Sequence, residues 1–158
     1  MFENLITDRT ILDFERWRTL RDKGIENMTE EEREEWSGDM KGAYNASDLN
    51  RVGAVLNTLR DRLKDAGYLG GNEFTMRTDW AKGETPTEAQ FSAYLRAVGT
   101  VRDAVTQFPE TPMTPEDTGG LDFEGANNIE RIALAVKDVI EKIKAALFYC
   151  NELFSGEV

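Results

Sequence analysis

A chain of 158 residues with 40% hydrophobic side chains is long enough for one domain with a hydrophobic core and too short for two, so we expect a single domain over residues 1–158. No run approaches the ~20 apolar residues that span a bilayer, the first residues (MFENLITDRT) do not form a signal peptide, and the single cysteine, Cys150, excludes an internal disulfide. The net charge of −11 repels phosphate backbones, so we expect neither a nucleic-acid nor a membrane partner.

The first predicted helix covers about residues 9–23. Phe14, Trp17 and Leu20 recur there at helical spacing and form one apolar face. Gly24 and the residue after it suit a left-handed cap with a hydrophobic contact. We therefore expect a helix whose apolar face, Trp17 included, packs in the core.

A second, short helix is predicted from Thr29 to Trp36. Thr29 and Glu32 have the spacing of a capping box, in which each side chain bonds the backbone amide of the other residue. The surrounding residues 26–39 (ENMTEEEREEWSGD) hold seven acids and one base. Such a charge run indicates either a solvated surface segment or a contact with a basic partner.

The third predicted helix begins within Asn45-Ala46-Ser47, which also fits an N-glycosylation acceptor. No secretory context supports glycosylation, whereas a side-chain oxygen of Asn45 or Ser47 would cap a helix by accepting from its first amides. Gly67 is expected to end this helix. Its apolar positions recur every three or four residues on one face: Leu49, Val52, Leu56, Leu59, Leu63 and Ala66.

Only the stretch GYLGGNEFTMRTDW has the character of a β-strand. Phe74, Met76 and Trp80 lie on one side of an alternating run that follows a glycine turn. A single strand cannot satisfy its own backbone hydrogen bonds. We therefore expect either a short β-hairpin or an extended loop around residues 70–80.

A fourth helix is predicted to start at Pro86 and Thr87, where Thr87 and Gln90 form a capping box, and to stop before Pro109. The following residues 109–120, rich in proline and glycine, are predicted to form an acidic linker without regular structure. The apolar face of the helix consists of Phe91, Tyr94, Leu95, Val98, Val101, Val105 and Phe108.

The last predicted helix is the longest, from about Asp122 to Cys150. The tail FYCNELFSGEV stays apolar and is expected to pack against another surface. Three long amphipathic helices with one or two short ones predict an all-α helical bundle. The apolar stripe of the last helix consists of Ile129, Ile132, Val136, Val139, Ile140, Ile143 and Leu147.

The residue types that carry most enzyme chemistry are missing or isolated. The chain has no histidine, which removes imidazole acid–base catalysis, most zinc sites and the di-iron Glu-x-x-His pattern. No phosphate-binding glycine loop and no calcium loop occur. Cys150 has no histidine to activate it, so we interpret it as a packing residue. We therefore expect a protein that is not an enzyme and has no catalytic residue, cofactor or metal ligand.

Aromatic side chains are the candidate contact residues. For the two tryptophans among them, core anchoring and a partner-facing role both remain open, because aromatic residues also dominate interface hot spots. The candidates are Trp36, Trp80, Phe148, Tyr149 and Phe154.

Several segments, in this order, resemble small prophage-encoded proteins of Firmicutes: LITDRT, KGAYNASDLNRVG, TDW before a Thr-Pro-Thr helix start, ANNIE and the closing SGEV. The resemblance spans nearly the whole chain, and KGAYNASDLNRVG is its most specific part. Members of that family are taken to be virion structural or tail-associated proteins. The resemblance implies a phage or prophage assembly protein in the virion or the cytoplasm of the bacterial host. It also implies that the partners are other virion proteins or further copies of the chain in a homo-oligomer.

The charge supports an alternative of a different class. An acidic intracellular regulator or adaptor would bind a basic protein partner through its net charge of −11. The excess charge is confined to two segments, residues 26–39 and 109–124, while the predicted long helices balance acids against bases. That distribution favours the assembly protein over the regulator.

Overall fold

The computed structural model describes residues 1–116 and 121–155, with residues 149–155 described as backbone. Its regular structure is entirely helical: the described residues form no strand. This confirms the predicted all-α bundle. The five α-helices are α1 (Ile11–Lys23), α2 (Glu30–Ser37), α3 (Ala46–Asp65), α4 (Glu88–Asp103) and α5 (Phe123–Ser155), with single 3-10 turns at Phe2–Asn4 and Ile25–Asn27.

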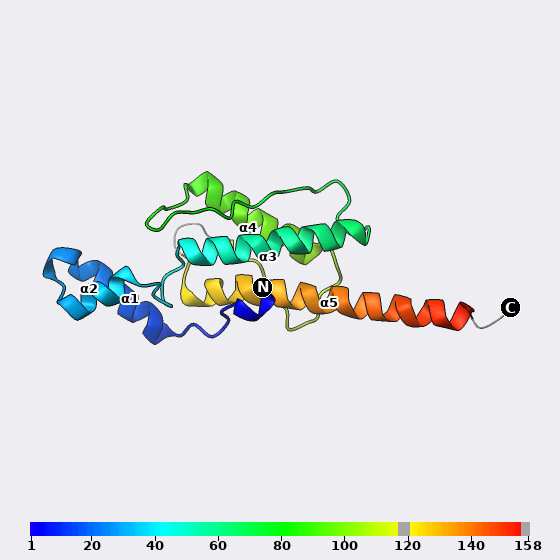
Figure 1. Ribbon diagram of the computed structural model, residues 1–158, viewed down its shortest axis with the longest axis horizontal. Helices are drawn as coiled ribbons and strands as arrows, with labels where there is room; N and C mark the ends of the chain where they lie inside the picture. The colour runs from blue at the N-terminus through cyan, green and yellow to red at the C-terminus, as the bar shows by residue number, and fades with distance from the viewer. Residues whose placement is uncertain (117–120, 156–158) are drawn as a thin grey trace.

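The bundle proper consists of α3, α4 and α5, which pack against one another along their lengths (Figure 1). The predicted apolar faces meet in its interior, except that the prediction is wrong for Ala66 and Leu147, which are exposed at the ends of these faces. Each fully buried leucine or isoleucine contributes about 2 kcal/mol. The short helices α1 and α2 lie together at one end, and α5 runs on beyond the other end (Figure 1). The fully buried side chains of the bundle include Val52, Val55, Leu56, Leu59, Leu63, Val98, Val101, Ile129, Ile132 and Val136.

Helix α3 starts at the Asn45-Ala46-Ser47 stretch as predicted. The Asn45 side chain accepts hydrogen bonds from the amides of Ser47 (2.9 Å) and Asp48 (3.3 Å). The Asp48 carboxylate in turn accepts from the Asn45 amide at 3.0 Å, which completes a capping box. Thr29 and Glu32 form the capping box predicted for α2. Both starts are local, so the sequence pattern alone predicts them.

Two helix ends differ from the prediction. Helix α1 begins at Ile11 rather than at about residue 9, because Thr10 and Asp13 form a capping box that the sequence analysis overlooked. Helix α5 continues to Ser155, five residues beyond the predicted end at Cys150.

Helix α4 is shorter than predicted and ends at Asp103 instead of continuing to Phe108. The Gln107 side chain donates to the backbone carbonyls of Arg102 and Val105 (2.9 Å for the latter), so it replaces the amides of a further helical turn. Pro109 adds to this effect, since it disfavours a helical conformation in the residue before it. The residues that follow, up to 116, form no helix or strand, as predicted for the linker.

The stretch with strand character is an extended segment, not a hairpin, and two asparagines of α3 bind its backbone. The Asn57 side chain accepts from the Met76 amide (2.8 Å) and donates to the Met76 carbonyl (3.0 Å). Asn50, two turns earlier, makes the same pair of bonds with Trp80, at 2.8 and 3.0 Å. Each amide side chain thus offers the donor and acceptor that a neighbouring strand would provide.

We call residues 10–42, which contain α1 and α2, the N-terminal lobe. Its buried hydrophobic side chains are only Leu20 and Met28. Gly24 has a positive φ of 75°, but its ψ of 146° lies outside the left-handed helical region, so the predicted left-handed cap is wrong. Ile25, for which a hydrophobic contact was predicted, is 57% exposed. The lobe is too small to enclose that side chain, which lies instead at the boundary between lobe and bundle.

Candidate functional site

All three tryptophans of the chain line one groove between the N-terminal lobe and the bundle. Trp17 comes from α1, Trp36 from the last turn of α2, and Trp80 from the extended segment before α4. Ile25 and Met40 add further apolar surface to this groove, whose volume is about 720 Å³. We call it the tryptophan groove and regard it as the candidate functional site.

The prediction that Trp17 packs in the core is wrong. Its indole is half-buried and lies outside the bundle core. The ring packs against Phe14 (centroids 5.5 Å apart) on one turn of α1 and against the Arg21 guanidinium (4.9 Å) on the next. The main contacts of α1 are with the small helix α2 and the 3-10 turn Ile25–Asn27, and Trp17 lines the groove.

Trp80 combines the two roles that the sequence left open. It packs against the bundle core, and it also lines the groove. The Arg77 guanidinium lies 4.2 Å from the centre of its ring and is held there by Asp79 (2.7 Å) and Glu84. The hydrogen bonds that Arg77 donates to Glu84 and, secondly, to Asp79 raise its pKa, so this guanidinium remains charged.

Trp36 differs from the other two tryptophans in its neighbours. Among the described residues, neither an aromatic ring nor a cation lies against its indole. The end of α2 that carries it has no basic residue in its last turn. Instead, the Lys82 ammonium from the opposite wall of the groove donates to the Ser37 carbonyl.

Of the other predicted contact residues, Phe148 does not line the tryptophan groove. Its side chain is 61% exposed on α5. The side chains of Tyr149 and Phe154 lie outside the described residues. Trp36 and Trp80 are therefore the predicted residues that the fold brings together.

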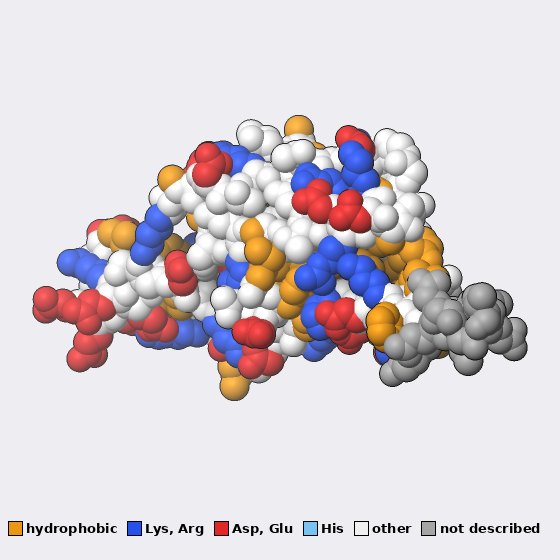
Figure 2. All heavy atoms as spheres, turned by 45° about the vertical axis from the view of Figure 1, so that its right-hand side comes forward, with side chains coloured by type: hydrophobic (Ala, Val, Ile, Leu, Met, Phe, Trp, Pro, Cys, Tyr) orange, Lys and Arg blue, Asp and Glu red, His pale blue; other side chains and the backbone are white. Residues whose placement is uncertain are grey.

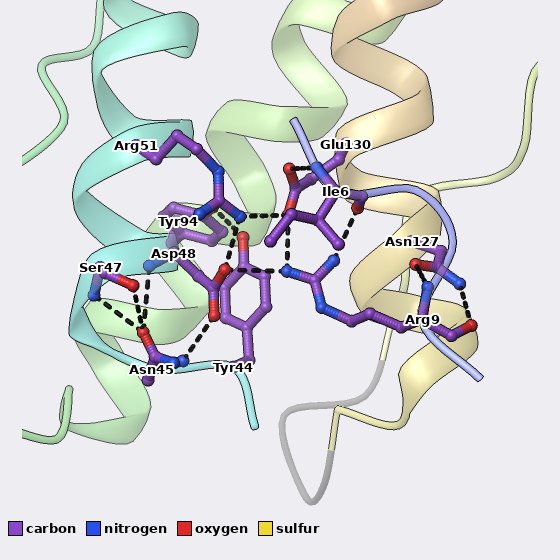
Figure 3. Close-up of polar contacts among 10 residues, drawn as sticks. All are labelled: Ile6, Arg9, Tyr44, Asn45, Ser47, Asp48, Arg51, Tyr94, Asn127 and Glu130. Atoms are coloured by element: carbon purple, nitrogen blue, oxygen red, sulfur yellow. Dashed lines mark hydrogen bonds and ion pairs between the residues drawn. The ribbon is translucent and has the colours of Figure 1, made fainter. Parts of the chain in front are cut away.

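A second feature of the structure, which the sequence analysis missed, is a buried polar network of two arginines and two carboxylates (Figure 3). Arg9 lies 2.8 Å from both Asp48 and Glu130. Arg51 contacts the same two carboxylates at 2.5 and 2.9 Å. The side chains of Arg9, Asp48 and Glu130 are at most 4% exposed. Two positive and two negative charges compensate one another, which makes their burial tolerable.

The network fastens the N-terminal segment to the start of α5 (Figure 3). Glu130 accepts a hydrogen bond from the Ile6 amide at 2.6 Å. Asn127 bonds the backbone amide and carbonyl of Arg9, at 3.0 and 2.9 Å. Since both carboxylates are held by arginines and closed off from solvent, the arrangement suits anchoring rather than reaction with a substrate.

A pair of tyrosines closes one side of the network. The hydroxyls of Tyr44 and Tyr94 are 2.5 Å apart, and the Arg9 guanidinium lies 5.5 Å from the Tyr44 ring centre. Burial raises the pKa of both phenols. Both hydroxyls therefore stay neutral while the protein is folded.

The two carboxylates of the network could have been identified from the sequence. Glu130 is a lone acid within the apolar stripe of the last helix, and Asp48 precedes the first leucine of the third. A charge on an apolar face indicates a buried partner of opposite sign. The partner, Arg9, lies at the start of the first predicted helix, 121 positions before Glu130, and pattern analysis gives no reason to pair the two.

Comparison with known proteins adds no relative: the chain matches no protein-family model, no curated protein and no solved structure. Over residues 1–116 and 121–155, no helix combines the length and apolar character needed to cross a membrane. Within the same residues, no group of three or more acidic or cysteine side chains is arranged to hold a metal ion.

Proposed function

We propose that the protein is a non-enzymatic phage or prophage assembly protein, associated with the tail, that acts through protein–protein contacts. The observation that carries this proposal is the convergence of Trp17, Trp36 and Trp80 on one open groove. Tryptophan is the residue most enriched at the energetic centres of protein interfaces, where a partner covers its large apolar surface. Three from separate parts of the fold therefore favour a docking surface.

The phage class is supported by the segments that resemble prophage-encoded proteins. Three of them, LITDRT, KGAYNASDLNRVG and ANNIE, lie far apart in the sequence and meet in the buried network. They supply Arg9, Asp48, Arg51, Asn127 and Glu130, which fasten the N-terminal segment to the bundle. The segments that carry the resemblance thus include those that anchor the N-terminal segment to the bundle, whereas the groove lies on the surface.

The outer part of α5 offers a second contact surface. Leu147, on the part that continues beyond the bundle, is 61% exposed. Helices in proteins gain most of their stability from tertiary packing. An exposed apolar side chain on this outer part is therefore suited to packing against a neighbouring protein in an assembly.

An acidic regulator that binds a basic protein is the second candidate. It is favoured by Glu30, Glu31 and Glu34 on α2, which take part in no ion pair of the described residues. The two candidates differ in where the protein is found after particle assembly. An assembly protein stays with purified particles, whereas a regulator stays with a host protein.

Particle purification tests the proposal. After induction of the prophage, we expect the chain to co-sediment with particles, and deletion of its gene to give incomplete or fewer particles. Trp36→Ala should reduce its incorporation. The matched control is Tyr68→Ala, which removes an exposed aromatic side chain (43% exposed) outside the tryptophan groove and should leave incorporation unchanged. Normal particles that lack the chain would overturn the proposal.

A further inference from the structure

We infer that the tryptophan groove receives an arginine-bearing segment of a partner protein, with a guanidinium placed on the indole of Trp36. The inference rests on the proposed function, since it gives the chemistry of the partner that docks at the same groove. It depends on three observations: the cations on the other tryptophans, the polarity of the end of α2, and the uncompensated acids beside it.

The other two tryptophans of the groove already carry arginines on their rings. The Arg21 guanidinium lies 4.9 Å from the Trp17 ring and the Arg77 guanidinium 4.2 Å from the Trp80 ring. A cation over an indole face is attracted by the negative charge density of the ring, and a flat guanidinium can also stack on it. Trp36 is the groove tryptophan without such a cation among the described residues.

The groove also receives the negative end of a helix. Trp36, Ser37 and Gly38 at the end of α2 line it, and the backbone carbonyls of the last turn carry the partial negative charge of the helix dipole. Because α2 has no basic residue in its last turn, compensation comes from outside, through the Lys82 ammonium on the Ser37 carbonyl. This contact places a cationic side chain at the end of α2.

The segment that carries Trp36 has an excess of carboxylates. Asp39 lines the groove, and Glu34 lies on α2 outside the groove; neither takes part in an ion pair of the described residues. Residues 26–39 together hold seven acids and one base. Figure 2 shows acidic side chains gathered at the end of the molecule formed by α1 and α2. A basic partner segment is therefore attracted to this end, and an acidic segment is repelled.

The shape of the groove suits a segment of polypeptide. It is open to solvent along the junction between lobe and bundle, and its apolar floor includes Ile25, Met40 and Ala43. A peptide with alternating arginine and apolar residues would place apolar side chains on this floor and cations towards Trp36 and Asp39. Arginine is favoured over lysine because its planar guanidinium both stacks on indole and bonds a carboxylate.

Intrinsic tryptophan fluorescence is the natural assay, since every tryptophan of the chain lines the groove. The probe is a synthetic peptide in which arginine alternates with leucine and glycine. Matched peptides replace every arginine with citrulline, which has the same shape without charge, or with lysine or glutamate. We expect saturable binding of the arginine peptide, weaker binding of the lysine peptide, and none of the citrulline and glutamate peptides.

Variants locate the binding. Trp36→Ala should weaken the affinity for the arginine peptide by about 10-fold, and Trp36→Phe, which keeps an aromatic ring and the fold, by less. Neutralising the two unpaired acids near the end of α2, Glu34→Gln with Asp39→Asn, should weaken this affinity several-fold at low salt. The control pair Asp65→Asn with Glu110→Gln changes the net charge equally at exposed positions elsewhere and should leave it unchanged.

Three results would overturn the inference: equal binding of the citrulline peptide, equal loss from the control pair, or a fluorescence change with protein concentration alone, which would mean that a second copy fills the groove. The outcome is independent of particle purification. Peptide binding without incorporation into particles would leave the groove's specificity in place and remove the assembly role. Incorporation without peptide binding would leave the assembly role in place and remove the proposed specificity for arginine.

Discussion

The bundle and the N-terminal lobe are stabilised in different ways. In the bundle, helices α3, α4 and α5 enclose a continuous set of buried leucine, isoleucine and valine side chains. In the lobe, the buried hydrophobic side chains are Leu20 and Met28, and capping boxes and ion pairs supply most of the remaining contacts. The comparison indicates a division of roles: the bundle provides stability, and the lobe presents the surface.

The location of the tryptophan groove follows from this difference. Its walls belong to both parts, with Trp17 and Trp36 on the lobe and Trp80 on the segment held by α3. A lobe with a small core is not able to bury large aromatic side chains, so they remain at its boundary. Changes to the bundle and changes to the N-terminal lobe should therefore alter the groove by different amounts.

The largest effect is expected at the buried network. Arg9→Met leaves two buried carboxylates with one arginine and should lower the free energy of unfolding by about 3–5 kcal/mol, measured by denaturant titration. Adding Glu130→Gln removes the uncompensated charge, so the double variant should lose less than the sum of the single variants. As a control, Arg131→Met removes an exposed arginine with one backbone contact, to Thr7, and should cost under ~1 kcal/mol.

A leucine truncation in each part compares the two cores directly. Leu59 and Leu20 are both fully buried. Leu59→Ala should destabilise the whole molecule by about 2–5 kcal/mol, seen together in circular dichroism and tryptophan fluorescence. Leu20→Ala should loosen only the lobe, so the fluorescence transition moves to lower denaturant while the helical signal of the bundle stays in place. Coincident transitions in both variants would contradict the division of roles.

Substitutions of two helical glycines should have smaller effects on stability, and one of them tests the packing of the extended segment that carries Trp80. A Cβ added at Gly53 of α3 would lie 2.8 Å from the Arg77 carbonyl in the extended segment. Gly53→Ala should therefore displace this segment and cost about 1–3 kcal/mol. At Gly99 of α4 the nearest atom, on Thr114, is 3.6 Å away, so Gly99→Ala should be neutral or stabilise by up to ~1 kcal/mol. Thermal melts of the two variants measure the contrast.

Acid should affect the lobe through its capping and ion-paired carboxylates. A hydrogen bond from Thr10 lowers the pKa of Asp13, one from Lys23 lowers that of Glu32, and Arg16 lowers that of Glu35. A lowered pKa stabilises the fold above the ordinary carboxyl pKa, and this contribution is lost as the pH falls through the lowered value, below about 4. Tryptophan fluorescence should therefore change below this pH. A Glu32→Gln variant should shift this change, and an unchanged profile would contradict the assignment.

Local features of the fold were predictable from the sequence, and contacts between distant segments were not. The apolar faces of α3, α4 and α5 follow from spacing along one helix, and the caps at Thr29 and Asn45 involve residues within one turn. The early end of α4 depends on the conformation of one side chain, Gln107, which composition does not reveal. The position of Trp17 depends on which helix faces α1, and periodicity gives no information about that.

The candidate site was predicted in part for the same reason. Trp36 and Trp80 were identified by residue type, because aromatic residues dominate interface hot spots, although core anchoring remained an alternative. Their meeting with Trp17 requires the lobe to fold back towards the extended segment, which depends on tertiary structure. The Arg9–Glu130 pair spans 121 positions, and only the lone acid on an apolar stripe hinted at it.

The long sequence separation of Arg9 and Glu130 has a consequence for synthesis. Arg9 leaves the ribosome early, but Glu130 follows 121 positions later, which at typical translation rates takes on the order of ten seconds. During that interval Arg9 can pair with Asp48, which follows 39 positions after it, but not with Glu130. The buried network is therefore completed only when α5 emerges, so the N-terminal segment gains its full anchoring at the end of translation.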